Sequence, residues 1–196
     1  MTNSYTRMDV TVESGVGSIT LNQPEEYNRM PLAFWSEFPD AVDSLDASGK
    51  VRALVIASTG KHFSAGMDLS VFTSGADAVL DRGRAGEAGR RRLGGLQDVF
   101  SRLEASRMPV LAAVQGGCVG GGVDLVAACD MRYCTADAFF CIQEINIGLA
   151  ADVGTLQRLP RLISQGMMRE LAYTGRRLYA EEARDIGLVN RVFETQ

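Results

Sequence analysis

Apolar and polar residues alternate near the start of the chain, in "MDVTVES" and "GSITLNQ". A period of two is typical of a strand with one buried face, and Gly15 and Gly17 separate the two stretches. The pattern therefore predicts an opening β-hairpin. Further along, "VRALVIAS" and "PVLAAV" are continuously apolar. They predict buried strands, the first of them covered on both faces.

Residues 31–47 carry apolar side chains at helical spacing, which predicts a helix. The apolar positions are Leu32, Trp35, Phe38, Val42 and Leu45. Pro39 has no backbone N–H to donate, so we expect it to kink or interrupt this helix.

Residues 72–95, by contrast, are rich in glycine and arginine and show little apolar periodicity. They predict a mobile surface excursion with solvated arginines, and contact of these arginines with phosphates is the functional alternative. The arginines are Arg82, Arg84, Arg90, Arg91 and Arg92. An amphipathic helix is expected after this excursion, closed by Pro109. Its apolar face consists of Leu96, Val99, Phe100 and Leu103.

The second half of the chain predicts short elements in alternation. In order, they are a turn and short helix at 116–130, strands at 131–137 and 139–142, a helix at 153–163 that breaks near Pro160, and a strand at 188–193. Two further helices should end at Gly175 and Gly187, where glycine suits a left-handed residue after the last turn. Because no linker or low-complexity tract interrupts the pattern, we expect one domain over residues 1–196.

The composition narrows the class of protein. The chain has 196 residues and is 46% hydrophobic, which suffices for one buried core. A formal charge of −4 does not favour nucleic acid as a partner. No stretch reaches the about 18 apolar residues of a membrane span, and the N-terminus resembles neither a signal nor a transit peptide. We therefore expect no membrane partner and a cytoplasmic protein, or a mitochondrial or peroxisomal one if it is eukaryotic with its ends removed.

The cysteines show no Cys-x-x-Cys pair, and the single histidine, His62, is far from them in sequence. They are Cys118, Cys129, Cys134 and Cys141. Their apolar surroundings predict small buried side chains rather than a metal site or disulfides.

Two glycine-containing turns each follow a predicted buried strand: "STGKHFSAGMDLS" and "QGGCVGGGVDL". A strand-to-helix corner presents backbone N–H groups and the positive end of a helix dipole, which favour negative charge on an oxygen. Neither turn fits the phosphate-binding patterns Gly-x-x-x-x-Gly-Lys-Ser/Thr or Gly-x-Gly-x-x-Gly, so nucleotide binding is disfavoured. Tight packing is the structural alternative for each turn.

Three carboxylates stand in apolar surroundings: Asp124 after the triple glycine, Glu144 after a predicted strand, and Asp152 in "GLAADVG". An unpaired buried charge is costly and usually changes its protonation instead. Structural alternatives exist for all three. Asp124 can occupy an exposed helix face, Glu144 a surface position at a strand end, and Asp152 the N-cap of the following helix. The residues alone leave the catalytic and structural roles open.

The stretches "FSAGMDL", "GGCVGGGVDLVAACDMRYC" and "AFFCIQEINIGLAADVGTLQRLP" resemble the crotonase superfamily, also called the enoyl-CoA hydratase/isomerase family. The resemblance runs from about Asp9 to Phe193. It implies an α/β crotonase fold, a spiral of repeated ββα units, in which the usual C-terminal helical trimerisation segment is missing. Asp124, Glu144 and Asp152 together resemble the Δ3,5-Δ2,4-dienoyl-CoA isomerase branch. Hydratases have Glu at the position of Asp124 and no acid at that of Asp152.

The resemblance also implies where an acyl-CoA thioester substrate binds. In the family, two backbone amides hold the thioester oxygen in an oxyanion hole, and they map by motif onto Met67 and Gly121. Substrate-binding positions map onto Ala65, Gly66, Met67, Asp68, Leu69 and Gly121. Both amides lie in the glycine-containing corners.

The implied reaction converts 3,5-dienoyl-CoA to 2,4-dienoyl-CoA in fatty acid β-oxidation, with proton transfer from C2 to C6. Two acids serve these distant carbons, each contributing about 10²–10⁴ in rate. Glu144 is expected to remove the C2 proton, and Asp152, protonated through burial, to donate one to C6. The direction could be reversed. Asp124 is expected to tune charge and substrate position.

No metal or other cofactor is implied, because the delocalised dienolate carries the charge and coenzyme A belongs to the substrate. A homotrimer or a dimer of trimers is implied if the C-terminal segment exists. Tyr27 and Arg29 depart from the Arg-Asn-Ala-Met pattern that the family shows where CoA binds. His62 precedes the first corner, where packing of the loop is expected rather than catalysis.

Two other functions fit less well. One is an enoyl-CoA hydratase or Δ3-Δ2-enoyl-CoA isomerase, in which Asp152 has no role. The other is a non-catalytic crotonase-like protein that binds RNA or acts as a scaffold. The intact acids and glycines and the net negative charge argue against it, and the short C-terminus argues for it.

Overall fold

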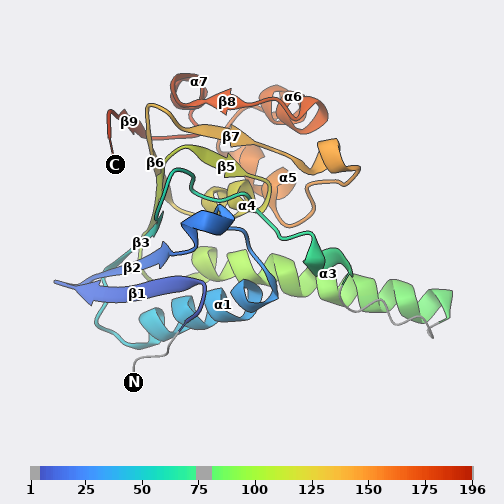
Figure 1. The fold of residues 1–196 in the computed structure, drawn as a ribbon, viewed down its shortest axis with the longest axis horizontal. Helices are drawn as coiled ribbons and strands as arrows, with labels where there is room; N and C mark the ends of the chain where they lie inside the picture. The colour runs from blue at the N-terminus through green and yellow to red at the C-terminus, as the bar shows by residue number, and fades with distance from the viewer. Residues whose placement is uncertain (1–4, 74–80, 196) are drawn as a thin grey trace.

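The computed structural model describes residues 5–73 and 81–195, and the larger of its two sheets has six strands (Figure 1). The strand order is β1-β2-β3-β4-β6-β9. The strands are Met8–Glu13 (β1), Val16–Leu21 (β2), Ala53–Ser58 (β3), Val110–Val114 (β4), Met131–Thr135 (β6) and Arg191–Phe193 (β9). The antiparallel pairing of β1 with β2, with Met8 opposite Leu21, confirms the opening hairpin. The remaining pairs are parallel.

A second, three-stranded sheet has the order β5-β7-β8. Its strands are Gly117–Val119 (β5), Phe139–Cys141 (β7) and Leu178–Tyr179 (β8). β4 is followed by β5, and β6 by β7, so successive turns of the chain add one strand to each sheet. This arrangement confirms the expected spiral of ββα units. The sequence did not predict β5 or β8, because two or three residues carry no periodicity and become strands only by pairing with β7.

Helices cover the sheets and connect the parallel strands. The α-helices are Leu32–Ala47 (α1), Ser70–Thr73 (α2), Arg82–Ala105 (α3), Gly121–Ala127 (α4), Thr155–Arg158 (α5), Gln165–Thr174 (α6) and Ala180–Asp185 (α7). The 3-10 helices are Pro24–Glu26 (η1), Glu144–Ile147 (η2) and Leu159–Arg161 (η3). Gly175 and Gly187 have positive φ after α6 and α7, and α5 gives way to η3 next to Pro160, as expected.

The helix α1 runs through Pro39 without interruption, so the expected break was wrong. Phe34, Trp35, Phe38 and Val42 are buried on both sides of the proline. Burial of such side chains contributes about 1.5–3 kcal/mol each, which offsets the about 3 kcal/mol cost of proline inside a helix.

The arginine-rich segment is part of α3, so the expected excursion was wrong over residues 82–95; residues 74–80 lie outside the described residues. The Asp81 side chain caps the helix by accepting hydrogen bonds from the N–H groups of Gly83 and Arg84. Glu87 pairs with Arg90 and Arg91 one turn away. Such local side-chain contacts stabilise a helix without an apolar face, which the periodicity does not detect. The arginines are exposed, as expected.

One hydrophobic core joins α1, α3 and the strands of the six-stranded sheet to α4, β7 and α6. Trp35 of α1 meets Phe100 of α3 at 5.4 Å between ring centroids. The strand β3 alternates between buried and partly exposed residues, so only one of its faces is fully covered. All four cysteines are buried with free thiols, which confirms their expected packing role.

Candidate active site

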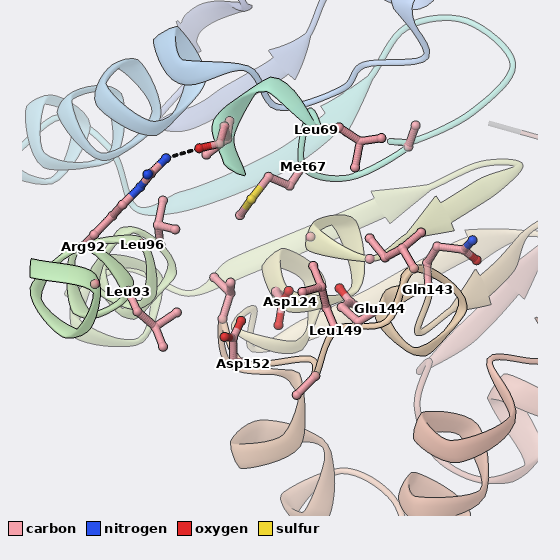
Figure 2. A pocket seen from close by; sticks show the side chains of 18 residues that line it. Met67, Leu69, Arg92, Leu93, Leu96, Asp124, Gln143, Glu144, Leu149 and Asp152 are labelled. Atoms are coloured by element: carbon pink, nitrogen blue, oxygen red, sulfur yellow. Dashed lines mark hydrogen bonds between the residues drawn. The ribbon is translucent and has the colours of Figure 1, made fainter. Parts of the chain in front are cut away.

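A cavity of about 370 Å³ opens between the loop after β3, α3, the start of α4 and the segment that follows β7 (Figure 2). It is lined by Ala65, Met67, Leu69, Val71, Gly89, Arg92, Leu93, Leu96, Gly120, Gly121, Asp124, Gln143, Glu144, Ile147, Leu149, Ala150, Asp152 and Val153. The structure thus brings the three predicted carboxylates and both glycine-containing corners to one cavity. Most other lining side chains are apolar, which suits an acyl chain.

The two corners meet at the backbone N–H groups of Met67 and Gly121. A Cβ built on Gly121 would lie 3.3 Å from Met67 N, and one built on Gly66 would lie 2.9 Å from Gly121 N. Within the described part of the chain, neither N–H donates a hydrogen bond. Two adjacent unengaged donors beside a cavity are suited to a developing oxyanion.

Backbone hydrogen bonds fix this corner. Ser64 N–H donates to Gly117 O at 3.1 Å, and Val119 N–H donates to Ser64 O at 3.0 Å. Met30 N–H donates to Gly66 O at 2.8 Å. Gly66 has a φ of +84°, and a Cβ there would lie 2.5 Å from Val119 O. Only glycine therefore fits at this position.

Asp68 and Gly66, predicted among the substrate-binding residues, do not line the cavity, whereas Ala65, Met67 and Leu69 do. The Asp68 carboxylate accepts a hydrogen bond from Ser70 N–H at 2.8 Å and pairs with Arg29. Hydrogen bonds from Ser70 and the Arg29 charge lower the pKa of Asp68. A carboxylate engaged in this way holds the loop and is directed away from the cavity.

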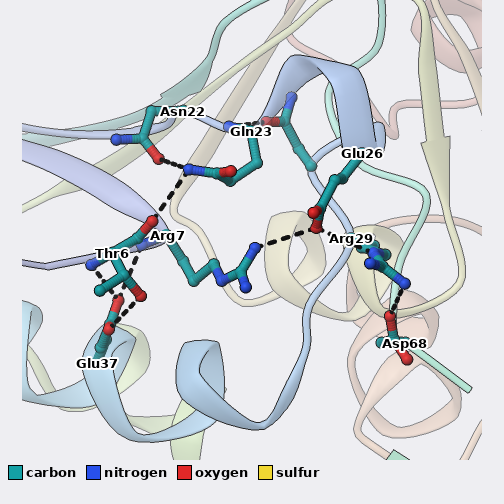
Figure 3. A network of polar contacts seen from close by, with 9 residues as sticks. Thr6, Arg7, Asn22, Gln23, Glu26, Arg29, Glu37 and Asp68 are labelled. Carbon is teal, nitrogen blue, oxygen red and sulfur yellow. Dashed lines mark hydrogen bonds and ion pairs between the residues drawn. The ribbon is translucent and has the colours of Figure 1, made fainter. Parts of the chain in front are cut away.

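The Asp68 contact belongs to a chain of ion pairs that reaches the N-terminal strand region (Figure 3). Arg29 also pairs with Glu26 at 3.1 Å, and Glu26 pairs with Arg7 at 3.0 Å. Tyr27, the other departure from the family pattern, is 60% exposed. Arg29 thus supports the loop next to the corner.

Glu144 is the first residue of η2 and is half-buried, not a surface residue at a strand end. Its Oε2 is buried without a hydrogen-bond partner among the described residues, and its Oε1 is 3.2 Å from the position of a Cβ on Gly120. Burial raises the pKa of Glu144 to about 7, and the negative charges of Asp124 and Asp152 add to the rise. Glu144 can therefore gain and lose a proton near neutral pH, next to the corner.

Asp124 is 1% exposed, which rules out the structural alternative of an exposed helix face. The reason is that every residue of α4 is buried. The Oδ1 atom of Asp124 accepts a hydrogen bond from Thr155 N–H at 2.6 Å. Burial raises the pKa of Asp124 to about 6, although the Thr155 hydrogen bonds and the Arg158 charge oppose the rise.

Asp152 is exposed, so the expected burial of its side chain was wrong in this structure. The chain around Leu149 and Ala150 is open to solvent, and nothing among the described residues covers the carboxylate. Asp152 is also not the N-cap of α5, because Gly154 occupies that position. The carboxylate of Asp124 supplies the acceptor for this helix start instead. In Figure 2, Asp124 lies between Asp152 and Glu144.

Helix α3 contributes cavity residues that the sequence did not assign to the site. They are Gly89, Arg92, Leu93 and Leu96. Their spacing of i, i+3, i+4 and i+7 was a helical signal, but the surrounding glycines and arginines obscured it. Arg92 donates a hydrogen bond to Val71 O and so joins α3 to α2 beside the cavity (Figure 2). Gln143, which also lines the cavity, had no distinguishing signal.

His62 has the expected packing role. Its Nδ1 accepts a hydrogen bond from Gly117 N–H at 2.9 Å, and its carbonyl accepts one from Asn28 Nδ2 at 3.0 Å. No three His, Cys, Asp or Glu side chains within residues 5–73 and 81–195 are arranged to hold a metal ion. No helix in these ranges is long and apolar enough to cross a membrane.

Comparisons with known proteins agree with this geometry. Residues 11–196 match the family model for enoyl-CoA hydratase/isomerase. The chain is 42% identical to the peroxisomal Δ3,5-Δ2,4-dienoyl-CoA isomerase of Arabidopsis thaliana over 97% of its own length and 70% of that protein. It is 44% identical to the mitochondrial Δ3,5-Δ2,4-dienoyl-CoA isomerase of Homo sapiens, over 97% of its own length and 60% of that protein.

A solved structure shows the same fold. The putative enoyl-CoA hydratase of Streptomyces coelicolor A3(2) superposes with a TM-score of 0.86 at 28% identity, over 98% of this chain and 69% of that one. The chain spans 60 to 70% of the length of the two isomerases it matches.

Proposed function

The chain belongs to the enoyl-CoA hydratase/isomerase family, and we propose that it isomerises 3,5-dienoyl-CoA to 2,4-dienoyl-CoA, a step of fatty acid β-oxidation. The observation that carries this proposal is one cavity that joins two unengaged backbone donors to three carboxylates. The similarity to two dienoyl-CoA isomerases supports the same assignment.

The first step takes place at the corner. The thioester oxygen accepts hydrogen bonds from the N–H groups of Met67 and Gly121, which places C2 next to Glu144. The unpaired Oε2 of Glu144 removes the C2 proton, and the electrons of the broken C–H bond move into a dienolate that ends on the thioester oxygen. Each donor that stabilises this oxygen contributes about 10²–10³ in rate.

The second step takes place further along the cavity, at Asp152. The dienolate takes a proton at C6 from the Asp152 carboxyl, and the double bonds come to rest at C2 and C4. A bound acyl chain covers Asp152 and keeps water away from the proton transfer. Before substrate binds, Asp152 is open to solvent, which is the source of the proton that it donates. Each turnover leaves a proton on Glu144 that must return to solvent.

Two substrates test the proposal. Supplied with a 3,5-dienoyl-CoA, the protein should generate the absorbance of the conjugated 2,4-diene. Supplied with a 2-enoyl-CoA, it should leave the enoyl absorbance unchanged. Hydration of the enoyl substrate without diene formation would contradict the proposal.

A hydratase is the second candidate, because Asp124 and Glu144 are close enough for the Asp124 charge to raise the pKa of Glu144. Hydration needs two acids that hold one water beside C2 and C3. One oxygen of Asp124 is already occupied by Thr155 N–H, which disfavours that role. The apolar cavity and the carboxylates beside it also disfavour a purely RNA-binding or scaffolding protein.

Other properties remain predictions. We expect a single domain, no metal or cofactor beyond the CoA of the substrate, and no nucleic-acid partner. We also expect a homotrimer or a dimer of trimers if the C-terminal segment exists, and a monomeric mass in gel filtration would contradict this expectation. We expect a cytoplasmic location, or a mitochondrial or peroxisomal one if the protein is eukaryotic; the two named isomerases are peroxisomal and mitochondrial.

A further inference from the structure

The carboxylate of Asp152 has no hydrogen bond of its own within residues 5–73 and 81–195, so its position depends on the backbone that carries it. We propose that Asp124 and Gln97 are positioning residues that clamp this backbone on its two sides. The expected effect of this clamp on catalysis rests on the proposed function, because Asp152 is the acid assigned to C6.

Gln97 of α3 provides one side of the clamp. Its Nε2 donates a hydrogen bond to the carbonyl oxygen of Asp152 at 2.6 Å. The contact joins residues 55 positions apart in sequence. Gln97 lies two residues before the buried Val99 of α3 and three before the buried Phe100. The Asp152 backbone is therefore hydrogen-bonded to the long helix α3, which forms one wall of the cavity.

Asp124 of α4 provides the other side. Its Oδ1 accepts the hydrogen bond of Thr155 N–H at 2.6 Å, three residues after Asp152. Asp124 and Thr155 are each 1% exposed, so water does not compete for this contact. A buried hydrogen bond that involves a charged acceptor is strong, and its loss leaves the Thr155 N–H unsatisfied. Asp124 thereby anchors the start of α5 to the element that also presents Gly121.

The chain between the two contacts has little freedom. Val153 O lies 3.5 Å from Arg158 Nη1, which donates to it. Gly154 has a φ of +139°, and a Cβ there would lie 1.7 Å from the same Arg158 nitrogen. Arg158 is itself held by Glu104 at 2.7 Å. With its ends clamped and its middle packed on Arg158, the segment can carry an exposed side chain at a defined place.

This arrangement gives Asp124 a role different from that of a proton carrier. Its contribution is to accept a hydrogen bond, which a neutral amide oxygen can also do. Loss of either side of the clamp should move the Asp152 carboxyl relative to C6 while the thioester end stays bound. A displacement of about 1 Å can cost on the order of 10² in rate.

Four variants test the clamp, with kcat and KM measured on a 3,5-dienoyl-CoA. Asp124→Asn keeps the acceptor for Thr155 N–H and removes the charge. Asp124→Ala removes the acceptor, and Gln97→Ala removes the donor to Asp152. Gln157→Ala is the matched control, an exposed glutamine on α5 outside the clamp. Hydrogen–deuterium exchange of residues 152–156 reports the mobility of the segment without any need for turnover.

We expect Asp124→Ala and Gln97→Ala to lower kcat on the order of 10²-fold with little change in KM and to speed exchange at 152–156. Asp124→Asn and Gln157→Ala should keep most of the kcat and the slow exchange. If Asp124→Ala does not fold, Gln97→Ala and Asp124→Asn still decide the question.

Two results would overturn the clamp. An Asp124→Asn variant that has lost its kcat but keeps slow exchange would show that Asp124 acts through its charge or proton. Unchanged kcat and exchange in Gln97→Ala would show that α3 does not hold Asp152. A wild-type protein that makes no diene would contradict the proposed function instead, and the exchange measurements would still test the clamp.

Discussion

The corner formed by Met67 and Gly121 and the segment from Gln143 to Gly154 present the two halves of the proposed chemistry in different ways. The corner uses main-chain atoms, and backbone hydrogen bonds from Met30, Ser64 and Val119 hold it. The segment presents side chains from a short 3-10 helix and a partly exposed loop. Side-chain contacts attach this segment to the rest of the fold. Gln97 donates a hydrogen bond to Asp152 O, and Asp124 accepts one from Thr155 N–H, directly after the segment.

The difference shows which changes each region tolerates. At the corner, side-chain identity matters little except where a Cβ would collide, as at Gly66. In the segment, the carboxyl groups of Glu144 and Asp152 carry out the proposed proton transfers. Replacement of one carboxyl oxygen in either side chain should therefore impair the reaction. The corner is expected to bind and polarise the thioester, and the segment to move the protons. Substitutions in each region can test whether the two tasks are separate.

The largest effect is expected at Glu144 in the segment. Glu144→Gln keeps the shape of the side chain but cannot accept the C2 proton, so kcat on a 3,5-dienoyl-CoA should fall about 10²–10⁴-fold. KM should change little because the corner is intact. Glu25→Gln, at an exposed position, is the control. A Glu144→Gln variant with wild-type kcat would remove the acid–base role.

A smaller but still large effect is expected at the corner. Gly66→Ala would place a Cβ 2.5 Å from Val119 O and 2.9 Å from Gly121 N, which displaces one donor and should lower kcat/KM about 10²–10³-fold. Gly49→Ala is a matched control, since Gly49 also has positive φ but no atom within 4 Å of its Cβ position. It should lose stability only, by roughly 1–2 kcal/mol. Equal kinetics for the two variants would contradict the donor assignment.

The pH profile should report the segment rather than the corner. Burial raises the pKa of Glu144 to about 7, so below that pH the carboxyl is protonated and cannot act as a base. The logarithm of kcat/KM should therefore rise as pH increases toward about 7, the range in which the Glu144 carboxyl loses its proton. In Asp124→Asn the rising part of the profile should move to lower pH, because the negative charge that raises the pKa of Glu144 is removed. A profile that does not move would show that the two carboxylates are not coupled.

The smallest effect on activity is expected from His62, which supports the corner without touching the cavity. His62→Ala leaves Gly117 N–H without its acceptor, so the free energy of unfolding should fall by about 1–3 kcal/mol. Chemical denaturation measures this loss, and kcat should stay close to that of the wild type. Full stability together with a loss of activity as large as that of Glu144→Gln would point to a direct role for His62.

Strong patterns in the sequence predicted much of the fold. The hairpin of β1 and β2, the amphipathic faces of α1 and α3, and the glycines after α6 and α7 follow from local preferences. The extension of α3 to Arg82 was missed, because its first half depends on a cap and ion pairs instead of an apolar face. The strands β5 and β8 were missed because pairing alone defines them.

For the site, the sequence by itself determined which groups are present: two glycine-containing corners and three acids in apolar surroundings. Motif resemblance grouped them in one family, and the matched family model agrees. Only the tertiary structure decided how each acid is used. It buries Asp124 against Thr155, leaves Glu144 Oε2 unpaired beside the corner, and exposes Asp152. These differences arise because burial and hydrogen-bond partners come from segments far apart in sequence, and local patterns do not record them.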